Sequence, residues 1–221
     1  MSSPATGWRF PRTFWVANSV ELFERAAYYG MFIALSVYLT DEVGFTDVET
    51  GWIAAAFAAL LYLMPSLSGA IADRVGFRPA LLVAFGSLAT GYAMLGAWQG
   101  KPTAIAALAI IVAGGSFVKP IISGTVALCS DEQHRARAFS IFYLIVNIGS
   151  FAGKTVAKPL RTGLGIETIN FYSAAMAAIG LAIVFLAYKP PRGSGEPGSA
   201  VRSRSIGETV SGLFRVLRNP R

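Results

Sequence analysis

Six apolar runs, each about as long as a membrane is thick, dominate this sequence. A helix needs about 20 apolar residues to cross the ~30 Å hydrocarbon core of a bilayer. Only helices and closed barrels satisfy their backbone hydrogen bonds in lipid, and these runs are continuous rather than alternating. The sequence therefore predicts an all-α membrane protein, a bundle of six transmembrane helices. The expected spans are residues 13–40, 50–72, 79–98, 103–128, 136–160 and 169–188.

The composition favours the same class of protein. Hydrophobic residues make up 54% of the chain and charged residues only 14%, with a mean hydropathy of +0.53, which is too apolar for an ordinary water-soluble domain. The first residues lack a short apolar core followed by a cleavage site, so no removable signal peptide is expected. The single cysteine, Cys129, excludes an intramolecular disulfide.

The chain has a net charge of +7, and its basic residues are unevenly distributed among the expected loops. Thirteen of the 19 Lys and Arg residues fall on one side of the expected spans, in the lead-in, in two inner loops and after the sixth span. Cytoplasmic loops carry such an excess, so both termini are predicted to be cytoplasmic, in a plasma or inner membrane. The basic charge is interpreted as a topology signal in a lipid bilayer, and no nucleic-acid partner is expected.

The chain divides into three parts by composition. Residues 1–189 form the expected six-helix bundle, and the Gly/Pro/Ser/Arg-rich residues 190–204 are expected to be a flexible cytoplasmic linker. Residues 205–221 have apolar positions at helical spacing and predict an amphipathic interfacial helix. Six spans and a basic linker are typical of half of a two-fold repeated transporter, so the expected partner is a second six-helix bundle, a missing carboxy-terminal half or another subunit.

Three charges lie inside the first expected span, in the stretch "ELFERAAYYG". Glu21, Glu24 and Arg25 share one helical face because they are three and four residues apart. Glu24 is roughly eleven residues into the span, or about 16 Å at ~1.5 Å per residue. Ionisable residues at mid-membrane are costly unless paired or hydrated, and they mark ion or substrate pathways.

Lys119 is a charge at a matching depth in the fourth expected span. We expect it to pair with Glu24, since each is otherwise an uncompensated buried charge. The alternative is a static pair that only holds two helices together. Pro120 loosens the helix beside Lys119, and small residues permit close helix approach at Gly114, Gly115 and Gly124.

The pattern E-x-x-E-R-x-x-Y-Y-G resembles the proton-coupled oligopeptide transporters of the major facilitator superfamily. It is met by Glu21, Glu24, Arg25, Tyr28, Tyr29 and Gly30. Further matches are Tyr62, "FVKP" around Lys119, and "FYLIVNIG" with Tyr143 and Asn147. The resemblance implies proton coupling by Glu21, Glu24, Arg25 and Lys119, and substrate contacts from Tyr28, Tyr29, Tyr62, Lys119 and Asn147.

A second motif, "SGAIADRVGFR", resembles the superfamily's cytoplasmic loop between helices two and three. The resemblance implies a gating role, with Asp73 or Arg74 touching neighbouring helix ends. The alternative is an ordinary basic loop. The matching residues are Gly69, Asp73, Arg74, Gly76 and Arg78.

Three positions depart from the family's pattern. Phe32 stands where peptide transporters commonly carry an arginine, and Ile121 replaces an asparagine. Lys154 is an unusual charge in the fifth span and is a candidate to supply the missing cation, with a lysine that snorkels to the outer interface as the alternative. These changes put the peptide substrate in question more than the fold.

The expected function is proton-coupled symport of di- and tripeptides by alternating access. The alternatives are transport of another small organic or anionic solute, or a half-sized membrane module that does not transport. No phosphate-binding loop occurs, and the single histidine, His134, is expected in a solvated loop. We expect no enzyme activity, no metal and no cofactor, with protons as the coupling ion.

Overall fold

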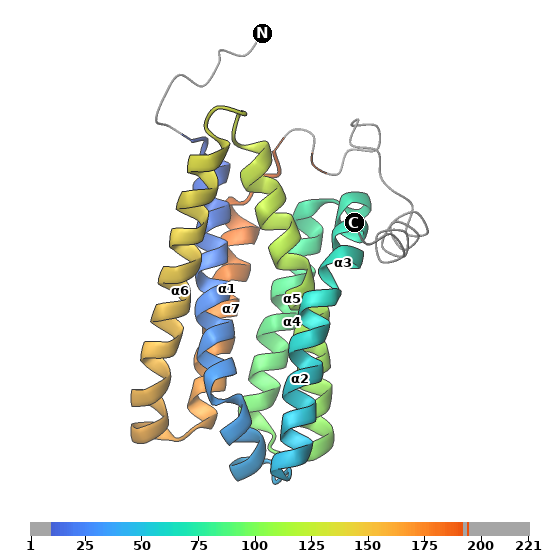
Figure 1. The fold of residues 1–221 in the computed structure, drawn as a ribbon, viewed down its shortest axis with the longest axis vertical. Coiled ribbons are helices and arrows are strands. Elements are labelled where there is room, and N and C mark those ends of the chain that lie inside the picture. The colour runs from blue at the N-terminus through green and yellow to red at the C-terminus, as the bar shows by residue number, and fades with distance from the viewer. Residues whose placement is uncertain (1–9, 192–193, 195–221) are drawn as a thin grey trace, which may run out of the picture.

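A computed structural model describes residues 10–191 and residue 194, which are all-helical or loop (Figure 1). This confirms the all-α class. The linker expected at residues 190–204 lies mostly, and the helix expected at 205–221 entirely, outside the described residues. The elements are α1 (Arg12–Val37), a π-helical turn η1 (Tyr38–Glu42), α2 (Asp47–Leu63), α3 (Pro65–Val75), α4 (Phe77–Ala97), α5 (Lys101–Leu128), α6 (Arg135–Leu164) and α7 (Glu167–Ala187).

Each of the six expected spans coincides with a helix or a pair of helices. Four of them, α4 to α7, are long and apolar enough to cross a membrane. Helices α2 and α3 meet at a bend of 45° and together are long and apolar enough to count as a fifth span if the pair is one broken span. Helix α1 has 26 residues, about 39 Å at ~1.5 Å per residue, and is less apolar because it carries the three charges.

The break in the second span is a feature that the sequence analysis did not predict. Pro65 occupies the first position of α3, directly after Met64. Proline has no backbone N–H to donate to the preceding turn, but it is well tolerated at the start of a helix. The chain therefore ends one helix at Leu63 and begins another, instead of running straight from residue 50 to 72.

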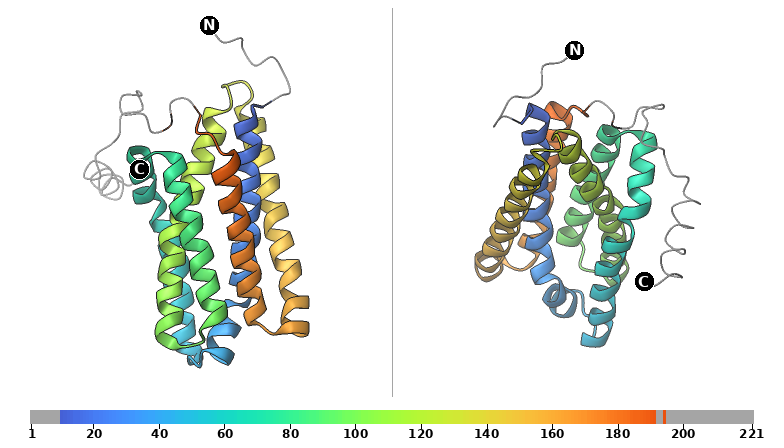
Figure 2. Two further views of the ribbon diagram at one scale, coloured as in Figure 1. Left: turned by 180° about the vertical axis from the view of Figure 1, so that it is seen from behind. Right: turned by 45° about the horizontal axis from the view of Figure 1, so that its top comes forward.

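The helices pack as two groups that meet along α7. Helix α1 packs chiefly against α6 and α7, and α4 packs chiefly against α5 and α7 (Figures 1 and 2). The Ser173 hydroxyl on α7 donates to the Ala27 carbonyl oxygen on α1 at 2.8 Å. The Ser68 hydroxyl on α3 donates to the Ser116 carbonyl oxygen on α5 at 2.7 Å. These bonds fix neighbouring helices in register where no water is available to compete.

Glycines allow the closest helix contacts. An added Cβ at Gly149 of α6 would lie 2.6 Å from the Leu22 carbonyl oxygen on α1, and one at Gly153 would lie 2.9 Å from the Gly30 nitrogen. The expected role of Gly114 is confirmed, because its Cβ would lie 2.6 Å from the Ala84 oxygen on α4. The 149–153 spacing is a small-xxx-small pattern, which brings two helix backbones together.

More of the basic residues lie at one end of the bundle than at the other. The start of α1, the α3–α4 junction, the α5–α6 loop and the end of α7 all lie at this end (Figure 1). At the opposite end, Lys101 pairs with Glu49 at 3.4 Å, in the acidic region that follows α1. The four basic segments thus lie at the same end of the bundle, as the charge pattern of the loops predicts (Figure 1).

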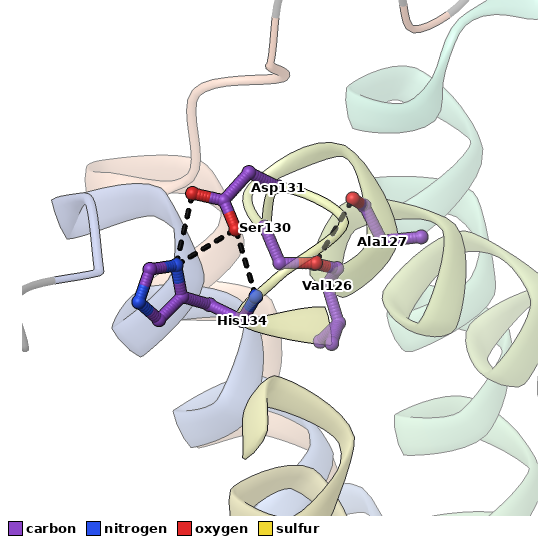
Figure 3. Close-up of polar contacts among 5 residues, drawn as sticks. All are labelled: Val126, Ala127, Ser130, Asp131 and His134. Carbon is purple, nitrogen blue, oxygen red and sulfur yellow. Dashed lines mark hydrogen bonds and ion pairs between the residues drawn. The ribbon is translucent and has the colours of Figure 1, made fainter. Parts of the chain in front are cut away.

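The α5–α6 loop is held by its own polar side chains (Figure 3). The Asp131 carboxylate accepts a hydrogen bond from the His134 backbone N–H at 2.8 Å and contacts the His134 ring nitrogen Nδ1 at 2.7 Å. The Ser130 hydroxyl donates to the Val126 carbonyl oxygen at 3.0 Å. The backbone hydrogen bond from His134 lowers the pKa of the Asp131 carboxyl below its usual range.

Replacing Gly153 by alanine should destabilise the bundle, because the new methyl meets the backbone of α1. The expected loss is roughly 1–3 kcal/mol, the usual cost of overpacking, measured as a lower thermal unfolding temperature in detergent. Gly163 is the matched control on the same helix, since an added Cβ there meets nothing within 4 Å. Gly163→Ala should be neutral or slightly stabilising, and equal effects of the two variants would refute the close α1–α6 contact.

Acid should loosen the start of α6. A carboxyl whose pKa is lowered in the folded state contributes stability above its unfolded pKa of about 3.9, and this is lost as pH falls through the lower folded value. The protection factor of the His134 amide against hydrogen exchange should therefore fall below about pH 4, and Asp131→Ala should lower it in the same way at pH 7. Glu132→Ala, which changes an exposed neighbour, should not change the protection factor; if it did, the Asp131 hydrogen bond would not be the cause.

Candidate functional site

A cavity of about 310 Å³ opens among α1, the α2–α3 break, α4, α5 and α6. Both charged and aromatic side chains face it, so it is neither a plain packing defect nor a lipid-facing groove. Its lining comprises Glu21, Glu24, Arg25, Tyr28, Tyr29, Leu61, Tyr62, Pro65, Leu88, Tyr92, Ile111, Gly115, Lys119, Phe142, Tyr143 and Val146.

One stripe of α1 supplies the charged wall of this cavity. Glu21, Glu24, Arg25, Tyr28 and Tyr29 follow one another at helical spacing and therefore lie on one face of the helix. Glu21 and Glu24 are only 1% and 2% exposed. The apolar residues of α1 face α6 and α7 instead, which leaves this stripe directed at the interior of the bundle.

The three charges of the stripe form a single ionic cluster. The Arg25 Nε atom lies 3.4 Å from the Glu21 Oε1 atom and is also hydrogen-bonded to the Glu24 carboxylate. Two carboxylates share one guanidinium, so the cluster carries one excess negative charge when both are ionised. A single proton makes it neutral. The Glu21 Oε2 atom is buried and has no hydrogen-bond partner among the described residues.

The direct contact expected between Glu24 and Lys119 is not formed, and this expectation is wrong for the conformation seen. Arg25 follows Glu24 on the same helix and takes its carboxylate. Lys119 has no ion pair within the described part of the chain, although it lines the same cavity and acts electrostatically on Glu21. Glu24 and Lys119 thus line the same cavity, as their matching depths suggested, but they do not form an ion pair with each other.

Aromatic side chains from α1, α2 and α6 complete the expected lining. Tyr28, Tyr29 and Tyr62 all line the cavity, as does Tyr143. The Arg25 guanidinium lies over the Tyr28 ring, 5.3 Å from its centroid. This places the Tyr28 ring and its hydroxyl beside the cation of the ionic cluster.

Two expected substrate-binding residues are not in the lining. Asn147 bonds within its own helix, where its Nδ2 atom donates to the Tyr143 carbonyl oxygen at 2.9 Å. The Lys154 Nζ atom lies 4.7 Å from the centroid of the Tyr29 ring. Lys154 therefore stands one aromatic ring away from the cavity, while the Asn147 amide is held away from it.

Phe32 occupies the position where the resemblance led us to expect an arginine. Its ring stacks on Tyr28 with centroids 5.2 Å apart, and it also packs against Phe57 of α2 at 6.3 Å. An aromatic stack between α1 and α2 therefore occupies this position, which carries no charge.

The residues expected to act in gating lie at the basic end of the bundle. Asp73 and Arg74 are exposed at the end of α3, and the contact with a neighbouring helix end comes from Arg78 instead. The Arg78 Nη2 atom donates to the Phe185 carbonyl oxygen on α7 at 2.8 Å. At Gly69 an added Cβ would meet Pro120 of α5 at 3.5 Å, an ordinary contact.

The wall formed by α4 and α5 contains residues that the sequence analysis did not assign to the site; Gly115 was expected only to allow close helix approach. Leu88 and Tyr92 of α4 are one turn apart, and Ile111 and Gly115 of α5 precede Lys119 at spacings of four residues. The i, i+4, i+8 spacing back from Lys119 was the available signal on α5. On α4 the sequence feature that could have indicated the site was Tyr92 in an apolar span, because a buried tyrosine hydroxyl needs a hydrogen-bond partner.

Comparisons with known proteins agree with this architecture. The profile described as Major Facilitator Superfamily matches residues 19–221. Dipeptide and tripeptide permease A of Klebsiella pneumoniae strain 342 is 29% identical over 181 residues, which cover 80% of this chain and 35% of the permease. The protein of the same name from Cronobacter turicensis is 32% identical over 146 residues, 64% of this chain and 29% of the permease. The chain thus spans about a third of these relatives.

Solved structures show the same fold. A crystal structure of the peptide transporter POT in complex with sulfate superposes with a TM-score of 0.78 at 24% identity, covering 98% of this chain and 47% of that one. A POT family transporter in complex with 5-aminolevulinic acid gives a TM-score of 0.77 at 26% identity, covering 94% and 45%. The resemblance to oligopeptide transporters and the half-transporter fold are confirmed. The chain is an integral membrane protein that belongs to the Major Facilitator Superfamily.

Proposed function

We propose that this chain is one six-helix bundle of a proton-coupled symporter that moves small peptides by alternating access. The observation that carries the proposal is the buried cluster of Glu21, Glu24 and Arg25 on the wall of a cavity of about 310 Å³. That volume lies within the ~300–1,000 Å³ of small-molecule sites. The relatives that share the fold are named as permeases and peptide transporters.

The excess negative charge of the cluster is its means of proton coupling. With both carboxylates ionised, Arg25 is shared between Glu21 and Glu24. Protonation of either carboxylate removes its negative charge and so weakens the electrostatic attraction between the cluster's carboxyl groups and the Arg25 guanidinium. Because a proton changes the interaction energy of only those conformations in which the cluster is intact, it shifts the equilibrium between inward- and outward-open states.

Substrate recognition falls to the cationic and aromatic side of the cavity. Lys119 lines the cavity without an ion pair in the described residues, so its ammonium is available to a peptide carboxylate. Tyr28, Tyr29 and Tyr62 provide hydroxyl groups and ring faces. We place Asn147 and Lys154 in the binding site only for a second conformation, in which α6 turns its exposed face toward the solute.

The whole transporter requires a second six-helix bundle to close the cavity from the other side. The comparison structures have about twice the length of this chain, with 47% of one and 45% of another covered. We infer that the basic end of the bundle is cytoplasmic, with both termini on that side of a plasma or inner membrane, because cytoplasmic loops carry the excess of Lys and Arg. Residues 190–204 then link the bundles on the cytoplasmic face, and contacts such as that of Arg78 with Phe185 belong to the inner gate.

A second candidate substrate is another small organic or anionic solute. Phe32 removes one cation from the expected peptide site and replaces it with an aromatic stack. One structural relative was solved with 5-aminolevulinic acid, which is not a peptide.

Uptake of radiolabelled dialanine into proteoliposomes tests the proposed function. The transporter with its second bundle should concentrate the dipeptide when the outside is acidic, and Glu24→Gln should abolish this accumulation while leaving counterflow exchange in place, because only the proton-dependent step is lost. Glu49→Gln is the matched control, since Glu49 lies exposed at the opposite end. Absence of proton-driven uptake of both dialanine and 5-aminolevulinic acid would indicate a membrane module that does not transport.

Lys154 should contribute to carboxylate binding through its position beside Tyr29. Lys154→Ala should raise KM for dialanine roughly fivefold, since an exposed ion pair contributes at most about 1 kcal/mol, with little change in the maximal rate. Lys158→Ala, which removes an exposed lysine one turn further along α6, should leave KM unchanged. Equal KM values for both variants and the wild type would assign Lys154 to the lipid interface.

A further inference from the structure

Tyr92 is the cavity residue whose chemistry the proposed function does not use. It lies in the second half of α4 with its side chain fully buried, and it lines the cavity. Its hydroxyl has no hydrogen-bond partner among the described residues. Other buried tyrosines do find partners: the Tyr188 hydroxyl bonds with the Thr125 hydroxyl at 2.6 Å.

The surroundings of Tyr92 are ionic on one side and apolar on the other. It interacts electrostatically with Glu24, Arg25 and Tyr28 across the cavity. Leu88, one turn earlier on α4, lines the same wall and offers no polar atom. Glu21 and Glu24 of α1 are the carboxylates in the described lining of the cavity, so the α1 cluster supplies the charged acceptors that face the same space as the hydroxyl.

A buried hydroxyl without a partner is unfavourable, and it persists where water or a ligand completes its hydrogen bonds. The cavity is large enough for water, which occupies buried sites that offer two or more polar partners. Arg25 is bonded to one oxygen of Glu24, the Oε2 atom. A carboxylate accepts several hydrogen bonds, so Glu24 retains capacity for another donor.

We propose that Tyr92 is a positioning residue for proton coupling, whose hydroxyl donates through one water molecule in the cavity to the Glu24 carboxylate. The phenol keeps its own proton throughout. The water delivers the incoming proton to Glu24, which becomes a neutral carboxylic acid, and the water then reorients. This inference rests on the proposed function for its role in transport, but the hydrogen-bonded arrangement can be tested without a substrate.

The other titratable groups around the site come from several helices. From α1, Glu21 and Arg25 belong to the cluster and Tyr28 and Tyr29 flank it; α2 contributes Tyr62, α5 Lys119 and α6 Tyr143. Helix α7, which packs on α4, contributes no titratable residue to the described lining. Tyr92 is therefore the residue through which α4 contacts the ionic cluster of α1 in the proposed arrangement. Protonation of Glu24 then changes the water-mediated contact between α1 and α4.

Tyr92→Phe tests the arrangement, because it removes only the hydroxyl. Infrared difference spectra between acidic and alkaline pH, recorded on the whole transporter without substrate, report the carboxylic C=O stretch of protonated glutamates. Hydrogen-bond donation stabilises the ionised carboxylate, so its loss should strengthen proton binding about tenfold and move the midpoint to higher pH. In a Glu24→Gln background the same substitution should not move the remaining midpoint, since Tyr92 acts through Glu24.

Tyr188→Phe is the matched control, because that hydroxyl is buried and bonded outside the cavity lining. It should leave the titration unchanged. A purely structural Tyr92 predicts instead that Tyr92→Phe is neutral or stabilising in thermal unfolding, with the wild-type midpoint and band frequency, and that result would overturn the proposal. In the Tyr92→Phe variant, the pH profile of dialanine uptake should shift in the same direction as the infrared midpoint. If the infrared midpoint shifts but the wild type shows no uptake, the transport function is refuted while the contact between Tyr92 and Glu24 is still supported.

Discussion

The ionic cluster on α1 is the interaction on which the rest of the structure depends. Two nearly buried carboxylates and one guanidinium lie inside a bundle whose buried side chains are mostly apolar. Removing such groups from water is costly, and the attraction between them offsets the cost only if their remaining hydrogen bonds are also satisfied. Arg25 satisfies part of this requirement for Glu21 and Glu24, and the cavity beside them leaves room for water or a solute to satisfy the rest.

The packing of the neighbouring helices serves this cluster. Gly149 of α6 lies so close to α1 that an added Cβ would approach the Arg25 Cβ to 2.9 Å. Helix α6 therefore limits the space on one side of Arg25 and favours side-chain conformations that face the cavity. On the other side, the bend between α2 and α3 places Leu61 and Pro65 at the cavity wall. The close approach at Gly149 and the bend between α2 and α3 thus set the position of the cavity that holds the ionic cluster.

The part of the site that follows helical periodicity could be predicted from the sequence. Glu21, Glu24, Arg25 and the two tyrosines after them share one face because of their spacing alone, and Lys119 falls at the same depth by counting residues. The direct pair of Glu24 with Lys119 was wrong, because depth does not decide between two cations and Arg25 is adjacent in the chain. The bend was missed although its signal, a proline inside an expected span, is local to the chain. Tyr92 was missed because periodicity within one helix does not say which face of α4 meets the cavity.

The central claim is that the Glu21–Glu24–Arg25 cluster takes up the proton that is coupled to solute binding. Calorimetric titration of dialanine into the whole transporter, in buffers of different ionisation enthalpy, counts the protons exchanged on binding. The account predicts net proton uptake in the wild type that disappears when both Glu21 and Glu24 are replaced by glutamine. If the double variant still binds dialanine with the same number of protons taken up, the coupling site lies elsewhere in the protein.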